Sequence, residues 1–76
     1  MKASHAFLTN EQVKHLIETY CIDEPHPMAR SRLMGVGIPA HKEPQSASDI
    51  EVAPGRWASQ ANVDTWLYGD ELRITD

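Results

Sequence analysis

The chain has 76 residues, a net charge of −4 and a single cysteine, Cys21. This length allows one small domain, and a lone cysteine excludes an internal disulfide, so side-chain packing must supply the stability. No apolar run reaches the length of a membrane span, and the first residues turn polar too early for a signal peptide. We therefore expect a cytoplasmic protein with one domain over 1–76, a core at about 7–68 and a tail at 69–76.

Charge is distributed unevenly along the chain. Residues 26–42 contain basic side chains and no acid, whereas residues 43–76 contain seven acids and two arginines. Screening at physiological salt limits the reach of a charge to about 8 Å, so a nearby partner responds to local rather than net charge. The net negative charge argues against a nucleic-acid partner, but one face of the molecule can still be basic.

A first helix is predicted over 10–20. Thr9 followed by Gln12 fits a capping box, and Leu8 with Val13 has the spacing of a hydrophobic staple. Apolar residues then recur at the helical period. This stripe consists of Val13, Leu16, Ile17 and Tyr20.

A second helix is predicted over 27–34, after a tight turn. A residue before proline avoids helical dihedrals, and Pro27 suits a first helical turn because its missing N–H is not needed there. Ala29 and Leu33 form a thin buried stripe, and Gly35 is expected to end the helix. The two helices together predict a helix-turn-helix.

The next segment is rich in glycine and proline and poor in large apolar residues. "IPAHK" at 38–42 predicts a strand, "EPQSASDIEVAPG" at 43–55 a loop, and "RWAS" at 56–59 a returning strand. These three parts predict a β-hairpin with a long mobile tip, a wing beside the domain.

A last helix begins after Ser59 and ends at Gly69, with Val63, Trp66 and Leu67 facing inward. Trp57 and Trp66 are expected to anchor the core. The tail alternates apolar and polar residues, which fits either a strand or a disordered end that orders on a partner. The predicted fold class is α+β: two N-terminal helices, a hairpin and a C-terminal helix.

The sequence offers little for catalysis. The four histidines are not closely paired, and Cys21 with His26 alone makes no zinc site. Nucleophile-elbow and phosphate-loop motifs are missing from the sequence. We expect a protein that is not an enzyme and that has no catalytic residues, metal or cofactor.

The ordered set of motifs resembles the winged helix-turn-helix family of phage excisionases, with MerR-like DNA-binding domains and the Cox-type regulators among its relatives. Three stretches carry the likeness: "LTNEQVKHLI" at 8–17, "RSRLMGVGIP" at 30–39 and "GRWASQANVDTWL" at 55–67. A Pro-Gln-Ser-Ala-Ser run at 44–48 is similar to one in the wing of Cox proteins. The resemblance covers about residues 7–68.

This likeness implies a regulator that binds repeated sites on double-stranded DNA, bends the DNA, favours excision over integration and represses a promoter. It also implies a recombinase, such as a phage integrase, as partner. The charge pattern separately predicts head-to-tail self-association, with acidic residues 64–76 of one copy on the basic 26–42 segment of the next and Leu72 and Ile74 as apolar contacts. No membrane partner is expected. Arginine on the second helix would read guanine or clamp a phosphate, and cations on the wing would follow the DNA backbone. The DNA-binding residues expected are His26, Pro27, Arg30, Ser31, Arg32, His41, Lys42 and Arg56.

A second hypothesis belongs to another functional class. A small acidic protein can also be a phage inhibitor that binds a host protein or mimics DNA with its acidic C-terminal half. Direct DNA binding at modest salt separates the two hypotheses.

Overall fold

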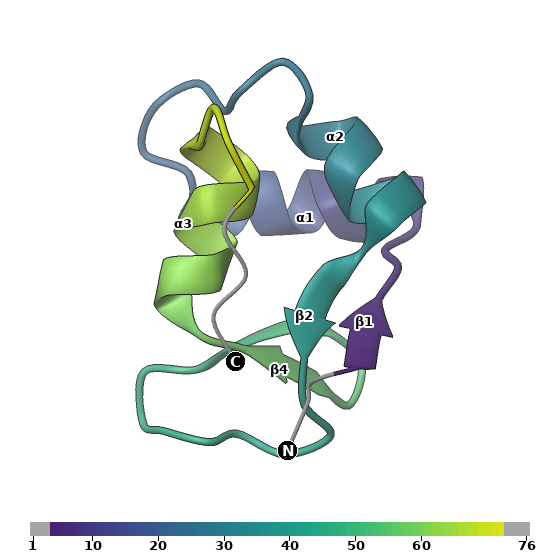
Figure 1. Cartoon of the computed structure of the whole chain (residues 1–76), viewed down its shortest axis with the longest axis vertical. Coiled ribbons are helices and arrows are strands. Elements are labelled where there is room, and N and C mark those ends of the chain that lie inside the picture. The colour runs from purple at the N-terminus through teal and green to yellow at the C-terminus, as the bar shows by residue number, and fades with distance from the viewer. Residues whose placement is uncertain (1–3, 73–76) are drawn as a thin grey trace.

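Helices and short strands alternate along the chain in the computed structural model, which describes residues 4–72 (Figure 1). The fold is α+β, as predicted. The described residues form three helices, the second of which runs from α2 into the π-helical turn η1, and two antiparallel strand pairs. The elements are β1 (Ser4–Ala6), α1 (Asn10–Tyr20), α2 (Ala29–Ser31), η1 (Arg32–Val36), β2 (Ile38–Ala40), β3 (Ile50–Ala53), β4 (Arg56–Ala58) and α3 (Gln60–Tyr68).

Helix α1 confirms the predicted bounds and caps. The Thr9 hydroxyl accepts a hydrogen bond from the Gln12 N–H at 3.2 Å, and the Gln12 side chain accepts one from the Thr9 N–H at 2.9 Å. Two donors of the first turn are thereby satisfied. Leu8 and Val13 are both buried, as the staple requires.

The second helix differs from its prediction at both ends. It begins at Ala29 rather than residue 27, because the His26 ring accepts the Met28 N–H and the His26 carbonyl accepts the Ala29 N–H. It continues through Gly35 as the π-helical turn η1, so Gly35 does not end it. The end comes at Gly37, which has a φ of 81° and donates its N–H to the Arg32 carbonyl at 2.8 Å.

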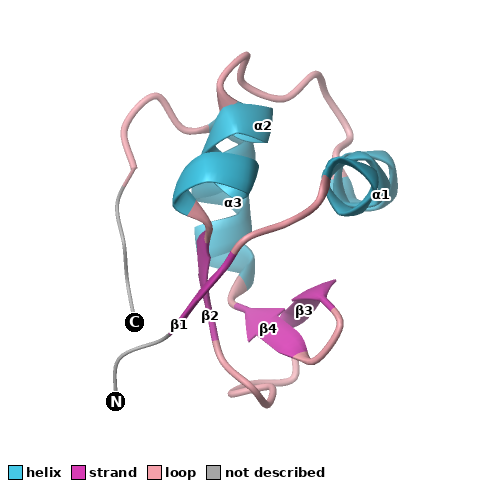
Figure 2. Cartoon of the chain, turned by 90° about the vertical axis from the view of Figure 1, so that its right-hand side faces the viewer, coloured by secondary structure: helices cyan, strands magenta, loops and turns pink. Residues whose placement is uncertain are grey.

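The strands form two antiparallel pairs, β1 with β2 and β3 with β4. A bridge between His41 and Trp57 joins β2 to β4, so the pairs lie next to each other (Figure 2). Strand β1 lies outside the expected core range, yet its Ala6 is buried. Only its distant partner β2 orders it, which local sequence could not reveal.

The predicted wing is wrong in its strand pairing and in the second half of its loop. Strand β2 pairs with β1 rather than with β4, and only the His41–Trp57 bridge joins the two segments that were expected to form the hairpin. Residues 50–53 form β3, which pairs with β4 across a bulge, and Val52 is buried. The remaining turn is held by Asp49, whose carboxylate accepts hydrogen bonds from the Gln45 N–H and the Ser46 hydroxyl, both at 2.8 Å. In the sequence, the alternation of apolar and polar residues covers only the four positions 50–53, which is too short to predict a strand.

The hydrophobic core contains the expected helical residues, with Ile17 at its border, except for Tyr20, which belongs to the predicted stripe but is exposed. Helix α3 begins at the predicted cap, where the Ser59 hydroxyl accepts the Asn62 N–H at 3.2 Å. Trp66 is fully buried, but Trp57 is only half-buried on the hairpin and is not a core anchor. The strands add further core residues: Ala6, Ile38, Ala40, Val52 and Ala58.

Candidate nucleic-acid interface

Arg30 is exposed on α2 and reaches the first residue of α1. Its Nη1 donates a hydrogen bond to Asn10 Oδ1 at 3.3 Å. Arg30 is therefore an exposed cation beside the N-terminus of α1, whose partial positive charge is offset in the first turn by Glu11. Pro27 and Ser31 are exposed near this pair in the chain. The pair Arg30–Asn10 therefore offers several donors of a kind that binds phosphate oxygens.

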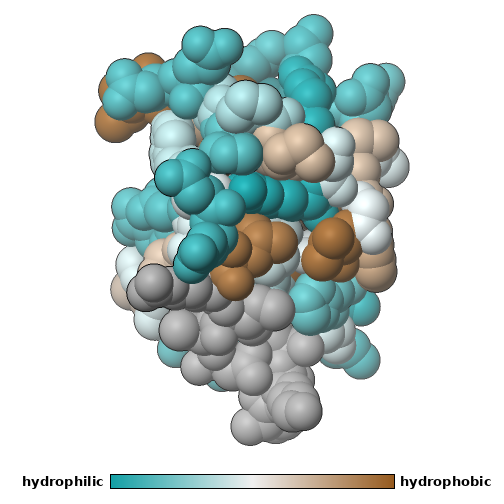
Figure 3. All heavy atoms as spheres, turned by 45° about the horizontal axis from the view of Figure 1, so that its top comes forward, coloured by the Kyte–Doolittle hydropathy of each residue, from teal (hydrophilic) through white to brown (hydrophobic). Residues whose placement is uncertain are grey.

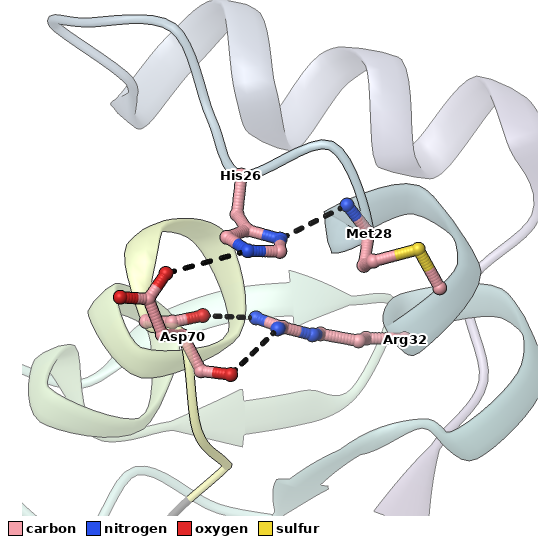
Figure 4. A network of polar contacts seen from close by, with 5 residues as sticks. His26, Met28, Arg32 and Asp70 are labelled. Atoms are coloured by element: carbon pink, nitrogen blue, oxygen red, sulfur yellow. Dashed lines mark hydrogen bonds and ion pairs between the residues drawn. The ribbon is translucent and has the colours of Figure 1, made fainter.

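Arg32 is not exposed, contrary to the prediction that it contacts DNA. Only 9% of the residue is accessible. Its guanidinium donates to the Gly69 carbonyl at 2.5 Å and to the Asp70 carbonyl at 3.4 Å, where α3 has ended (Figure 4). Successive helical residues turn by about 100°, so Arg30 and Arg32 point to nearly opposite sides. Arg32 caps α3 from within the fold.

The His26 ring is also engaged within the chain (Figure 4). Its Nδ1 accepts the Met28 N–H at 3.1 Å, and its Nε2 lies 3.5 Å from Asp70 Oδ1. A neutral ring with its hydrogen on Nε2 satisfies both contacts. The side chain is 24% exposed. His26 thus links the turn before α2 to the end of α3, rather than presenting a free ring at the surface.

The basic residues of the predicted wing differ in how far they are buried. Lys42 is exposed just after β2, whereas His41 is half-buried and its backbone exchanges hydrogen bonds of 2.7 and 2.8 Å with Trp57. Arg56 is half-buried on β4, and its Nη1 has no hydrogen-bond partner within the described residues. This nitrogen is itself buried, so it is not accessible to an acceptor outside the fold.

Three exposed side chains with apolar parts lie at or near the C-terminal end of α1. We call Tyr20, Ile22 and Tyr68 the Ile22 patch; Ile22 is 97% exposed. The Tyr68 hydroxyl accepts the Ile22 N–H at 3.1 Å and holds this loop against α3. Figure 3, turned toward this end, shows hydrophobic side chains separated by hydrophilic ones. Acidic side chains are exposed in the same stretch of chain: Glu18, Asp23 and Glu24.

Residues 4–72 contain no group of three or more His, Cys, Asp or Glu side chains that could hold a metal ion. None of the helices in this range is both long and apolar enough to cross a bilayer. In comparisons with known proteins, no family model, curated protein or solved structure matches the chain.

Only some of the predicted DNA-binding residues are exposed at the surface. Arg30 and Lys42 are exposed cations, and Ser31 and Pro27 are exposed beside Arg30 in the chain. Asn10 was missed, because an asparagine next to a helix cap fits a purely local role. Its contact with Arg30 depends on how α2 packs across the start of α1.

Proposed function

We propose that the chain is a DNA-binding regulator of the excisionase and Cox type, built as a winged helix-turn-helix. The order of α1, turn, α2, strands and α3 supports this proposal. The observation that carries it is the exposed Arg30 guanidinium beside Asn10, at the junction of the two N-terminal helices.

In this proposal α2 enters the major groove. Arg30 and Ser31 read base edges or hold a phosphate, while Asn10 and the N-terminus of α1 contact the backbone. Lys42 and Arg56 lie along the adjacent backbone from the hairpin. Arg32 and His26 stay within the fold and support the position of α2.

Binding at repeated sites would bend the DNA, favour excision over integration and block a promoter. The acidic residues 64–76 of one copy would meet the basic 26–42 segment of the next, giving head-to-tail association. The Ile22 patch supplies exposed apolar area for contact with a neighbour or with an integrase. No step of this function requires chemistry on a substrate.

The first test replaces Arg30 with alanine. Loss of a base-reading arginine should weaken specific binding by about 1–3 kcal/mol. Duplexes selected from a random pool would serve as ligands, with affinity measured by fluorescence anisotropy. The matched control is Lys14→Ala, an exposed cation on α1 that lies 4.0 Å from Glu18. Equal affinity of Arg30→Ala and Lys14→Ala for the selected duplex would disprove the assignment of α2.

The rival function, an acidic inhibitor of a host protein, draws support from the acid-flanked Ile22 patch. Under that hypothesis the selection yields no enriched duplex, even at low salt. Substitution of Ile22 by aspartate would then abolish binding to the host target while leaving the fold intact.

A further inference from the structure

A groove of about 570 Å³ separates α1 from the β3–β4 hairpin. Its wall on the helix side consists of Thr9, Glu11, Gln12 and His15. The opposite wall consists of residues 51–55, the end of β3 and the following turn. The side chains proposed to contact DNA, Asn10, Arg30 and Lys42 among them, do not line this groove, although its helix wall includes the first turn of α1.

Strand β3 has an unpaired edge on the side of the groove. All its ladder bonds go to β4, and no other backbone hydrogen bond of residues 50–53 is formed within the described part of the chain. Figure 2 places β3 on the side of the hairpin that faces α1. The free N–H and C=O groups of an edge strand are a template for another extended chain. Lysine often protects such edges, but β3 carries Glu51 instead.

The charged side chains around the groove have one sign. Glu11 and Glu51 carry the formal negative charges, and no lysine or arginine lines the walls. Glu51 is held by the Gly55 N–H, which donates to its Oε2 at 3.3 Å. Ala53 and Pro54 supply apolar surface on the hairpin wall, where Val52 is mostly buried. A ligand that fits this surface is extended, carries cations and has small apolar side chains.

We propose that this groove binds an extended, lysine- or arginine-bearing peptide segment of another protein, added to β3 as an extra strand. Strand β3 has four residues, so an added strand of similar length would pair along it. Main-chain pairing supplies affinity, and Glu11 and Glu51 select cations.

The test is a nuclear magnetic resonance titration of the full chain, followed through its backbone amides. The probe is an end-blocked eight-residue peptide of alternating lysine and valine. One control peptide alternates glutamate and valine, and a second is the lysine–valine peptide with alternate backbone nitrogens methylated. We expect the unmodified lysine–valine peptide to shift amides of residues 9–15 and 50–55. The methylated peptide should bind at least about fivefold more weakly, because it lacks the ladder donors.

Two variants separate charge in the groove from charge elsewhere. The double variant Glu11→Gln with Glu51→Gln should weaken lysine–valine binding by about three- to tenfold. Glu18→Gln, an exposed acid of α1 outside the groove, should leave the affinity unchanged. The proposal is overturned if the shifts fall outside these two segments or if methylation does not change affinity. It is equally overturned if both sets of variants weaken binding alike. DNA affinity plays no part in any of these results.

Discussion

Arg30 and Arg32 are two residues apart in sequence, yet their guanidinium groups serve different parts of the molecule. Two helical steps turn the chain by about 200°, so only one of the two can face solvent. Arg30 faces out beside Asn10, and Arg32 faces in toward carbonyl groups that follow α3. Residue type predicted arginine chemistry at both positions, but only packing decided which one binds within the fold.

Replacing Arg32 by methionine should therefore destabilise the protein, whereas Arg30→Met should not. Methionine keeps an unbranched stem but leaves the Gly69 and Asp70 carbonyls without their charged donor, at a cost of about 1–3 kcal/mol. Arg30 is exposed, and its loss should change stability by less than about 0.5 kcal/mol. Urea unfolding of both variants measures the difference. Equal stability would mean that the Arg32 contacts contribute nothing.

Tyr68 carries a pH-dependent contact. Its hydrogen bond with the Cys21 side chain, followed by desolvation, raises the pKa of Tyr68 above the ordinary 10.0. A raised folded-state pKa means that the stabilisation is complete below the unfolded pKa and is lost as pH rises through the folded one. In a Tyr20→Phe background, absorbance should show Tyr68 titrating above pH 10.0, and Cys21→Ala should bring its pKa down. An unchanged titration in the Cys21→Ala variant would contradict this origin of the shift.

Local signals located the longer elements well. The bounds of α1 and α3 follow from side-chain caps at Thr9 and Ser59, which act within three residues. The short strands β1 and β3 carried no comparable signal: β1 depends on β2, and β3 depends on a hairpin bulge. Elements of three or four residues are ordered by their partners, so their own sequence indicates them poorly.

Alanine substitutions at two glycines near the end of the second helix should change the stability of the protein in opposite directions. A Cβ at Gly35 would meet no atom within 4 Å, and the residue is helical, so Gly35→Ala should stabilise by about 0.5–1 kcal/mol. At Gly37, φ is 81° and a Cβ would lie 3.1 Å from the Ala6 carbonyl oxygen, so Gly37→Ala should destabilise by more than about 1 kcal/mol. Thermal melting of both variants gives the signs. A stabilising Gly37→Ala would refute its role as helix stop.

At the scale of the whole molecule, helix α1 separates two different surfaces. The Arg30–Asn10 pair lies at its start and the Ile22 patch beyond its end, about 16 Å apart for an 11-residue helix. The basic segment and the acidic half were visible in sequence. Their arrangement was not, because burial removes Arg32 from the surface and the His26–Asp70 contact engages His26. In the proposed function, the start of α1 would face DNA and its other end would contact a neighbouring copy.

Cooperative assembly is the prediction that tests this arrangement. In the proposed function, Arg30, Lys42 and Arg56 would supply about three phosphate contacts, and a slope of about −0.9 per contact would then imply weak binding by one copy. Firm occupancy then needs neighbours on adjacent repeats. Arg32 contacts the Asp70 carbonyl, so the tail should be cut after Glu71 to keep that contact; residues 73–76 lie outside the described range.

Removing 72–76 takes away the apolar Leu72 and Ile74 but leaves Asp64, Asp70 and Glu71 in place. It should leave affinity for a one-site duplex unchanged and weaken the steeper binding expected on a two-site duplex, because the tail loses its apolar contact with the next copy. Binding isotherms on both duplexes measure this, with Ile22→Asp as a second variant that targets the patch directly. If both variants still bind the two-site duplex cooperatively, the contact between copies lies elsewhere. If the unaltered chain binds two sites independently, the head-to-tail model is wrong, whereas specific binding to one site would remain intact.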